Sequence, residues 1–276
     1  MENTLQDAMA SAGLFSHKPI DIPANGKIVR FRVEGDKAGS RNGWAVLNAT
    51  VGAGFFGAFG NWKTGESHAW NSPSGQPKTF AERLENKQRS QALRDSIIKE
   101  RELVQAEART KAGRLWSRAR PATNAHPYLQ RKRVNAYGLR QLRDMLLIPA
   151  RDVNGTLHSL QFIGVDGTKR FLTGGRTAGC YFSIGRPVDR LLLTEGVATG
   201  STLHMATGAA VAVCFSAGNL LAVAQALRGK FPRLRLVLCA DFDGATPGNP
   251  GLTKAKEAAR AVGGFLAVPR LREETP

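Results

Sequence analysis

Three carboxylates stand directly after two of the most apolar stretches of the sequence. Glu195 follows the strand-like run LLLT, and Asp241 and Asp243 lie in the segment ADFDG, which follows LRLVLC. Two residues apart on an extended segment, Asp241 and Asp243 point to the same side. Clustered carboxylates repel one another unless a cation lies among them, and hard oxygen ligands favour Mg²⁺ or Mn²⁺. A single such acid is more simply a helix N-cap or a turn residue, but the two motifs together predict a metal site.

The elements that must position these acids lie in residues 189–276. We expect apolar strands at 191–194, 210–215, 234–240 and 265–268, and helices at 198–205, 219–228 and 253–262. Apolar strands that alternate with helices predict a parallel sheet covered on both faces, which is a Rossmann-like α/β fold. Ligands bind beyond the carboxyl ends of such strands. If the strands before Glu195 and Asp241 are neighbours, the three acids meet at one edge.

Residues 121–188 predict a mixed α+β basic subdomain. The stretch from 145 to 171 is typical of a strand, a turn at Val153–Gly155, a second strand, a turn at Asp166–Gly167 and a third short strand. Lys169 and Arg170 come just after the second turn. Exposed cations there are either a solvated loop surface or part of a binding site.

The first 120 residues predict two further parts. Residues 1–72 indicate a small β-rich N-terminal unit with glycine-rich turns. Its aromatic residues form either the core of a small sheet, which we favour, or a base-stacking platform: Trp44, Phe55, Phe56, Phe59 and Trp62. Residues 73–120 predict a basic helical linker, with a helix from about Thr79 to Ala119. This helix is either a solvated strut or lies along nucleic acid.

The charge of the chain indicates a polyanionic partner. The sequence has 39 Lys and Arg against 22 Asp and Glu, a net charge of +17. Between Gln76 and Arg143 there are 17 basic and 6 acidic residues, so this quarter of the chain carries an excess of 11 positive charges. Such a concentrated field suits the phosphates of nucleic acid.

Other classes of protein fit the sequence less well. No apolar run approaches the ~18 residues of a membrane span, so no membrane partner is expected. Cys180, Cys214 and Cys239 form no CxxC pair, so neither zinc nor a disulfide framework is expected, and a cytoplasmic location is predicted. We expect Cys214 and Cys239 to be buried packing residues.

The motifs resemble a known family. LLLTEG followed by LCADFDG is similar to the Toprim domain, the catalytic module shared by bacterial-type primases, topoisomerases and some nucleases. HPYLQRKRV resembles the YLxxRG-type segment of bacterial-type primases, with Lys132 at the arginine position. LLIPARDVNGTLHSLQFIGVDGTKRFLTGG resembles their segment that ends in KYlN. The resemblance covers roughly Trp116 to Pro269 and is greatest to primase-type proteins of phages, plasmids and integrated elements.

This resemblance implies template-directed synthesis of short RNA primers on single-stranded DNA from NTPs. Asp241 and Asp243 would hold Mg²⁺ or Mn²⁺, and Glu195 would be either a metal ligand or the general base. Basic residues would bind the triphosphate or the nucleic acid strand: Arg131, Lys132, Lys169 and Arg170. Lys254, near the start of the helix after the acids, either reaches a phosphate or is solvated.

Three departures from the family pattern leave other functions open. The chain lacks the zinc-ribbon cysteines that usually precede this core in primases, and it reads EGVATGS where cellular primases often carry a further Asp. It also has no GxxxxGK[ST] motif, so a replicative helicase would be a separate partner. One alternative is a Toprim nuclease, which hydrolyses phosphodiesters with the same acids. The other is a non-catalytic single-stranded-DNA-binding adaptor of the replication machinery.

Overall fold

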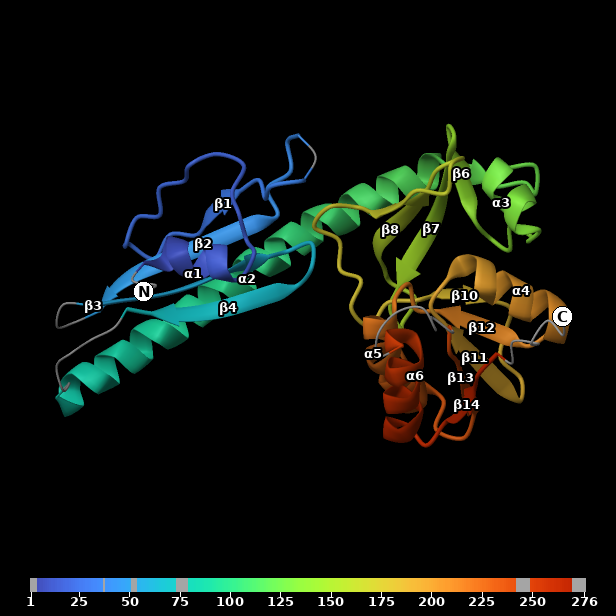
Figure 1. The fold of residues 1–276 in the computed structure, drawn as a ribbon. Helices are drawn as coiled ribbons and strands as arrows, with labels where there is room; N and C mark the ends of the chain where they lie inside the picture. Colours follow the sequence, from blue (N-terminus) through green and yellow to red (C-terminus); the bar gives the residue numbers. More distant parts are fainter. Residues whose placement is uncertain (1–3, 37, 51–53, 73–78, 242–248, 270–276) are drawn as a thin grey trace, which may run out of the picture. The chain divides into compact units, whose positions relative to one another are not determined.

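The chain forms two compact units, Met1–Glu107 and Ala108–Pro276. The computed structural model describes residues 4–36, 38–50, 54–72, 79–241 and 249–269 (Figure 1). The long helix α2, Phe80–Arg118, contributes residues to both units and confirms the helix predicted in this region. Across the described ranges, no helix is long and apolar enough to cross a membrane.

The first unit is a four-stranded antiparallel sheet with a helix on each face, in the order β1-β2-β3-β4. Its strands are β1 (Val29–Phe31), β2 (Gly43–Thr50), β3 (Gly54–Asn61) and β4 (Glu66–Asn71). On one face, Leu5 and Met9 of helix α1 (Leu5–Ser11) are buried against the sheet. On the other face, Leu93 of α2 packs with Trp44 and Phe56. The four strands lie within the segment that was predicted to be β-rich, and α1 was not predicted.

The aromatic side chains of this unit mostly form its core. Trp44, Phe56 and Phe59 are buried, and Trp62 stacks on Trp44 with the ring centres 4.8 Å apart. Phe55 alone among the five residues named above is exposed. The favoured interpretation, a sheet core, holds for four of these residues.

The second unit begins with a five-stranded antiparallel sheet, in the order β5-β6-β7-β8-β9. Its strands are β5 (Arg120–Pro121), β6 (Arg140–Leu142), β7 (Met145–Arg151), β8 (Leu157–Ile163) and β9 (Lys169–Phe171). The short helix α3, Pro127–Lys132, lies between β5 and β6. Strands β7, β8 and β9 and the turns between them match the prediction.

The mixed sheet follows, in the order β10-β12-β11-β13-β14. Its strands are β10 (Phe182–Ile184), β11 (Arg190–Thr194), β12 (Ala210–Val213), β13 (Arg235–Cys239) and β14 (Phe265–Ala267). Its helices are α4 (Val197–Thr207), the 3-10 turn η1 (Ala217–Asn219), α5 (Leu220–Lys230) and α6 (Pro250–Ala261). Strands β11 to β14 are parallel as predicted, but β10 adds an antiparallel edge beside β12. The sheet is thus only partly parallel.

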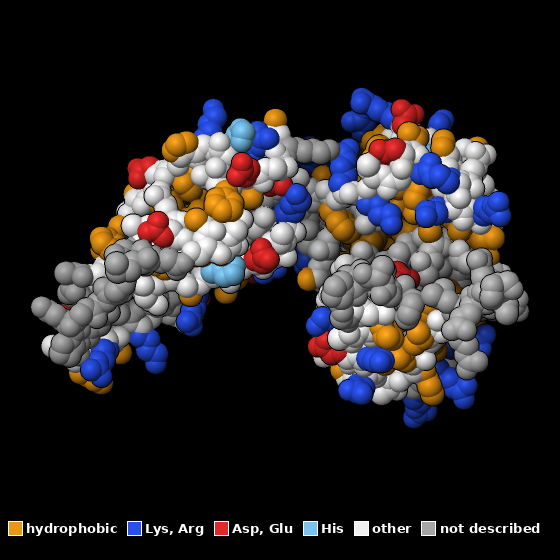
Figure 2. Space-filling view, viewed as in Figure 1, with side chains coloured by type: hydrophobic (Ala, Val, Ile, Leu, Met, Phe, Trp, Pro, Cys, Tyr) orange, Lys and Arg blue, Asp and Glu red, His pale blue; other side chains and the backbone are white. Residues whose placement is uncertain are grey.

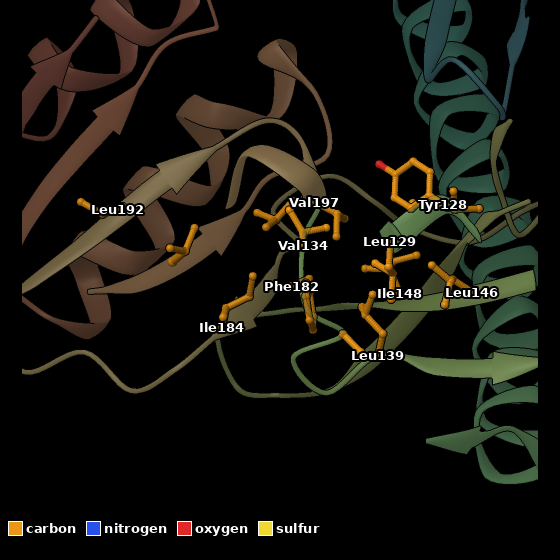
Figure 3. Close-up of a cluster of buried hydrophobic side chains, with 14 of the residues drawn as sticks. Tyr128, Leu129, Val134, Leu139, Leu146, Ile148, Phe182, Ile184, Leu192 and Val197 are labelled. Carbon is orange, nitrogen blue, oxygen red and sulfur yellow. The ribbon is translucent and has the colours of Figure 1, made fainter. Parts of the chain in front are cut away.

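One hydrophobic core joins the two sheets of the second unit (Figure 3). Ile148 of β7 and Ile163 of β8 share it with Ile184 of β10, Leu192 of β11 and Val213 of β12. A separate cluster buries the other face of the mixed sheet under α5 and α6, which Figure 1 shows together on that side. The second face of the antiparallel sheet packs against the last turns of α2 through Leu147 and Leu160. Both sheets are therefore covered on both faces.

Candidate active site

Glu195 and Asp241 emerge at the same edge of the mixed sheet. Strands β11 and β13 are parallel neighbours, with Leu193 opposite Leu238. Glu195 is the first residue after β11, and Asp241 is the second after β13. Both are half-buried. We call this edge, marked by these two carboxylates, the acid edge; Asp243 lies outside the described residues.

The start of helix α6 passes close to both acids at Gly251. A Cβ atom added to this glycine would lie 3.0 Å from Glu195 Oε1 and 2.9 Å from the backbone oxygen of Asp241. The helix is capped by Asn249, whose side chain accepts a hydrogen bond from the backbone N–H of Leu252 at 3.3 Å. Glycine at 251 thus lets α6 close over the acid edge. Sequence reasoning missed this residue, although a glycine one position after a helix-starting proline was a visible signal.

Two cysteines lie beside the acids but do not alter their chemistry. Burial raises the pKa of Cys214, and the negative charge of Glu195 raises it further. Burial and the charge of Asp241 raise the pKa of Cys239 to about 11. Both thiols are therefore neutral near pH 7 and poor ligands for a soft metal, since the thiolate is the binding form. Both are buried, as predicted.

Carboxylate oxygens are thus the metal donors that the described residues bring to this edge. The described ranges contain no group of three or more His, Cys, Asp or Glu side chains placed to hold a metal ion. The Asp243 carboxylate, the third acid predicted from the sequence, is outside those ranges. The donor chemistry fits Mg²⁺ or Mn²⁺ rather than zinc.

The loop after β12 is held in an unusual conformation. Phe215 has a φ of 73°, in the left-handed region that bulky side chains avoid at a cost of about 1–3 kcal/mol. The buried Asn219 fixes the loop, because its amide donates to the carbonyls of Cys214 and Cys180, both at 2.9 Å. Its Oδ1 accepts from the N–H of Gly179 at 2.8 Å. The backbone N–H of Cys214 also donates to the Thr194 carbonyl at 2.7 Å, which places the loop beside Glu195.

Strand β9, a basic edge strand of the antiparallel sheet, contacts the loop that follows β12. The ring of Phe171 meets that of Phe215 edge-on, with centres 5.4 Å apart and planes at 83°. Lys169 is paired with Ile163, whose side chain faces the mixed sheet, so Lys169 and Phe171 share that face. Arg170 is on the opposite face, with its guanidinium 5.2 Å from the ring centre of Phe162. The two cations predicted as a pair therefore point to different sides.

The other predicted cations lie on helices α3 and α6. Arg131 is exposed near the end of α3, and its guanidinium donates to the Val165 carbonyl at 3.1 Å, just before β9. Lys132, the last residue of α3, is exposed. Lys254 forms an ion pair with Glu257 at 2.8 Å on the surface of α6, which favours the solvated interpretation of that lysine.

The positive charge belongs almost entirely to the second unit. Residues 1–107 contain 14 basic and 12 acidic residues, whereas residues 108–276 contain 25 basic and 10 acidic ones. Residues 108–143 alone hold 10 Lys and Arg and no acid. Figure 2 shows Lys and Arg side chains spread over the part of this unit that carries α3 and the antiparallel sheet. The first 28 residues of α2, 80–107, have 6 basic and 6 acidic residues, so the basic character of this helix is confined to its end.

The chain is similar over nearly its whole length to proteins named DNA primase. No family model matches it. One "DNA primase TraC" of Escherichia coli is 34% identical over 281 residues, which cover 97% of this chain and 26% of that protein. A second "DNA primase TraC" of Escherichia coli is 35% identical over 282 residues, covering 95% of this chain and 19% of that protein. The primase resemblance is thereby confirmed, and the chain spans only about a quarter to a fifth of these relatives' length.

Two solved primase structures are also similar in part. The primase fragment of the bacteriophage T7 primase-helicase protein aligns with 56% of this chain and 66% of its own, at 16% identity and a TM-score of 0.42. A DNA primase domain from Pseudomonas aeruginosa aligns with 50% of this chain and 47% of its own, at 17% identity and a TM-score of 0.33.

The close approach at Gly251 gives a test of the acid edge. Gly251→Ala places a methyl group against the Glu195 carboxylate and the Asp241 backbone, so one of them must move. We expect a loss of about 1–3 kcal/mol in the free energy of unfolding, measured with urea. The control is Gly229→Ala in α5, where an added Cβ meets nothing within 4 Å. Equal stability of the two variants would contradict the described packing.

Proposed function

We propose that this chain is a Toprim-type primase module that synthesises short RNA primers on single-stranded DNA. The observation that carries the proposal is the position of strand β9 near the loop beside Glu195: Phe171 contacts Phe215, and Lys169 is on the face of β9 that is turned to the mixed sheet. The similarity to proteins named DNA primase supports the same reaction. The α/β arrangement of strands β11 to β14 with their helices supports the assignment of the Toprim domain.

The proposed reaction joins two nucleotides. The 3′-hydroxyl of one nucleotide attacks the α-phosphorus of a nucleoside triphosphate, the new P–O bond forms, and pyrophosphate leaves. Asp241 and Asp243, with or without Glu195, would hold Mg²⁺ or Mn²⁺, which when bound neutralises the triphosphate and the charge that develops in the transition state. Glu195 either completes that ligand set or takes the proton of the attacking hydroxyl.

The cations have separate tasks in this proposal. Lys169, on the face of β9 that is turned to the mixed sheet, binds the triphosphate opposite the acids. Arg131 and Lys132 at the end of α3 bind the DNA backbone. The acid-free segment 108–143 holds the template through its phosphates, without regard to sequence. We propose a replicative helicase as a partner of this module.

The carboxylates provide the first test. Glu195→Gln and Asp241→Asn each remove a charge at the acid edge, so primer synthesis should fall by at least about a hundredfold. The unfolding midpoint should not fall, because repulsion between the acids is relieved. The assay supplies single-stranded DNA, labelled NTPs and Mg²⁺ or Mn²⁺ to the purified chain.

A matched control for these variants lies at the opposite end of the same strand. Asp189, whose side chain is 68% exposed, directly precedes β11, and Asp189→Asn should leave synthesis unchanged. Full primer synthesis by the Asp241→Asn variant would refute the site. Template cleavage without primers would indicate the nuclease, and a bound but unchanged template would indicate the adaptor.

The charge distribution predicts where single-stranded DNA binds. Replacing the exposed Arg114, Arg118 and Arg120 by Ala should weaken binding, and should reduce the slope of log affinity against log salt by up to about 2, at ~0.7 per phosphate contact. Fluorescence anisotropy over a salt series measures the slope. The control removes three exposed cations from the charge-balanced part of α2: Lys87, Arg94 and Arg101. Equal slopes for the two triple variants would contradict the assignment.

The opposite faces of β9 separate two roles for its cations. Lys169→Ala should raise the KM for NTPs by about tenfold or more, since a charge-assisted contact to phosphate is lost. Arg170→Ala should change KM much less, and should cost about 0.5–1 kcal/mol of stability through its contact with Phe162. Both variants should bind single-stranded DNA within a few-fold of the unmodified chain. Steady-state kinetics measure the KM for NTPs of both variants. A larger increase in KM from Arg170→Ala than from Lys169→Ala would contradict the assignment of triphosphate binding to Lys169.

A further inference from the structure

Phe171 is a large apolar residue that is not buried in a core. It lies at the end of the edge strand β9 and is 36% exposed. The other two residues of this strand, Lys169 and Arg170, are exposed cations. The exposed aromatic side chain of this basic strand is therefore available to a ligand.

The orientation of the Phe171 ring is fixed by its neighbour. The rings of Phe171 and Phe215 lie at 83° to each other, and an edge-to-face contact of this kind leaves at least one face of the Phe171 ring clear of Phe215. Phe215 itself is held in its left-handed backbone conformation by the hydrogen bonds of Asn219. Strained backbone of this kind is kept where the surrounding structure over-determines it, which is common at functional sites. Asn219 and Phe215 are thus positioning residues for Phe171.

We infer that Phe171 is a stacking platform for a nucleobase at the acid edge. This inference rests on the proposed function, and it adds recognition of a base to the recognition of phosphate. Every nucleobase has a π face, so stacking on Phe171 would tolerate all four bases. Lys169, on the same face of β9, would then bind the phosphates of the same nucleotide. The base belongs either to the incoming NTP or to the template strand.

The experiment compares ligands that differ only in having a base. One arm measures the Kd of ATP and of ribose 5-triphosphate with Mg²⁺ by calorimetry. The other measures the Kd of a single-stranded oligodeoxynucleotide and of the same strand with abasic sites. In the arm that contains the stacked base, the unmodified chain should bind the base-bearing ligand about tenfold more tightly.

Three variants assign that difference to Phe171. Phe171→Leu should remove it, while affinity for the base-free ligand stays unchanged. Phe171→Trp should retain it, and the unchanged affinity of Phe171→Leu for the base-free ligand excludes a folding defect. The control is Phe265→Leu, which changes a 58% exposed phenylalanine on β14. This strand is at the edge of the mixed sheet opposite to β10, and the variant should leave the difference in affinity intact.

The outcomes separate the subsite from the proposed function. If Phe171→Leu loses the difference in affinity between the base-bearing and the base-free ligand, the platform is supported. The arm in which the loss occurs, ATP or DNA, identifies the source of the base. A difference that persists in Phe171→Leu, that disappears equally in Phe265→Leu, or that is absent from the unmodified chain overturns the platform. In that case NTP and DNA binding would still stand for the proposed function. Failure of the unmodified chain to bind any of the four ligands would refute both.

Discussion

The core shared by the two sheets of the second unit is the constraint on which the rest depends. Alternate residues of β7 and β8 point to the mixed sheet, and Ile148 and Ile163 pack there against Ile184 and Leu192. The register of β8 with β9 then decides which side chains of β9 lie on the face that is turned to the mixed sheet. A slip of one residue would exchange Lys169 for Arg170, because successive side chains of a strand alternate between faces. The chemistry of the proposed site is therefore set by apolar packing.

Much of this arrangement could be predicted from the sequence. The apolar runs before Glu195 and Asp241 are buried strands, and burial on both faces is why they contain no polar alternation. Their parallel direction followed from the alternation with helices, whereas their adjacency was only a condition of the prediction, which the pairing of β11 with β13 meets. The two consecutive hairpins of β7, β8 and β9 were predicted from their turn sequences, in which Gly155 and Gly167 adopt positive φ. Local signals of this kind are strong because each depends on a few neighbouring residues.

Other features depend on contacts between segments distant in sequence, and no local pattern reveals them. Strand β10 has three residues and is fixed by its pairing with β12. Asn219 acts on the carbonyls of residues about 40 positions earlier, and Phe171 meets Phe215 across two sheets. The opposite orientations of Lys169 and Arg170 required the register of β9. Helix α1 is different, since Thr4 and Asp7 form a capping box that the sequence displays.

The division of charge refines the electrostatic interpretation of the sequence. A window from Gln76 to Arg143 averages two different segments, because the acids of α2 all precede residue 108 and offset the cations there. Within that part of α2, pairs such as Arg89 and Glu85, 2.7 Å apart, neutralise charge locally. A strand of nucleic acid responds to the summed field within about a Debye length, so balanced segments contribute little attraction. The positive field therefore originates in the second unit, which also carries the carboxylates of the proposed site.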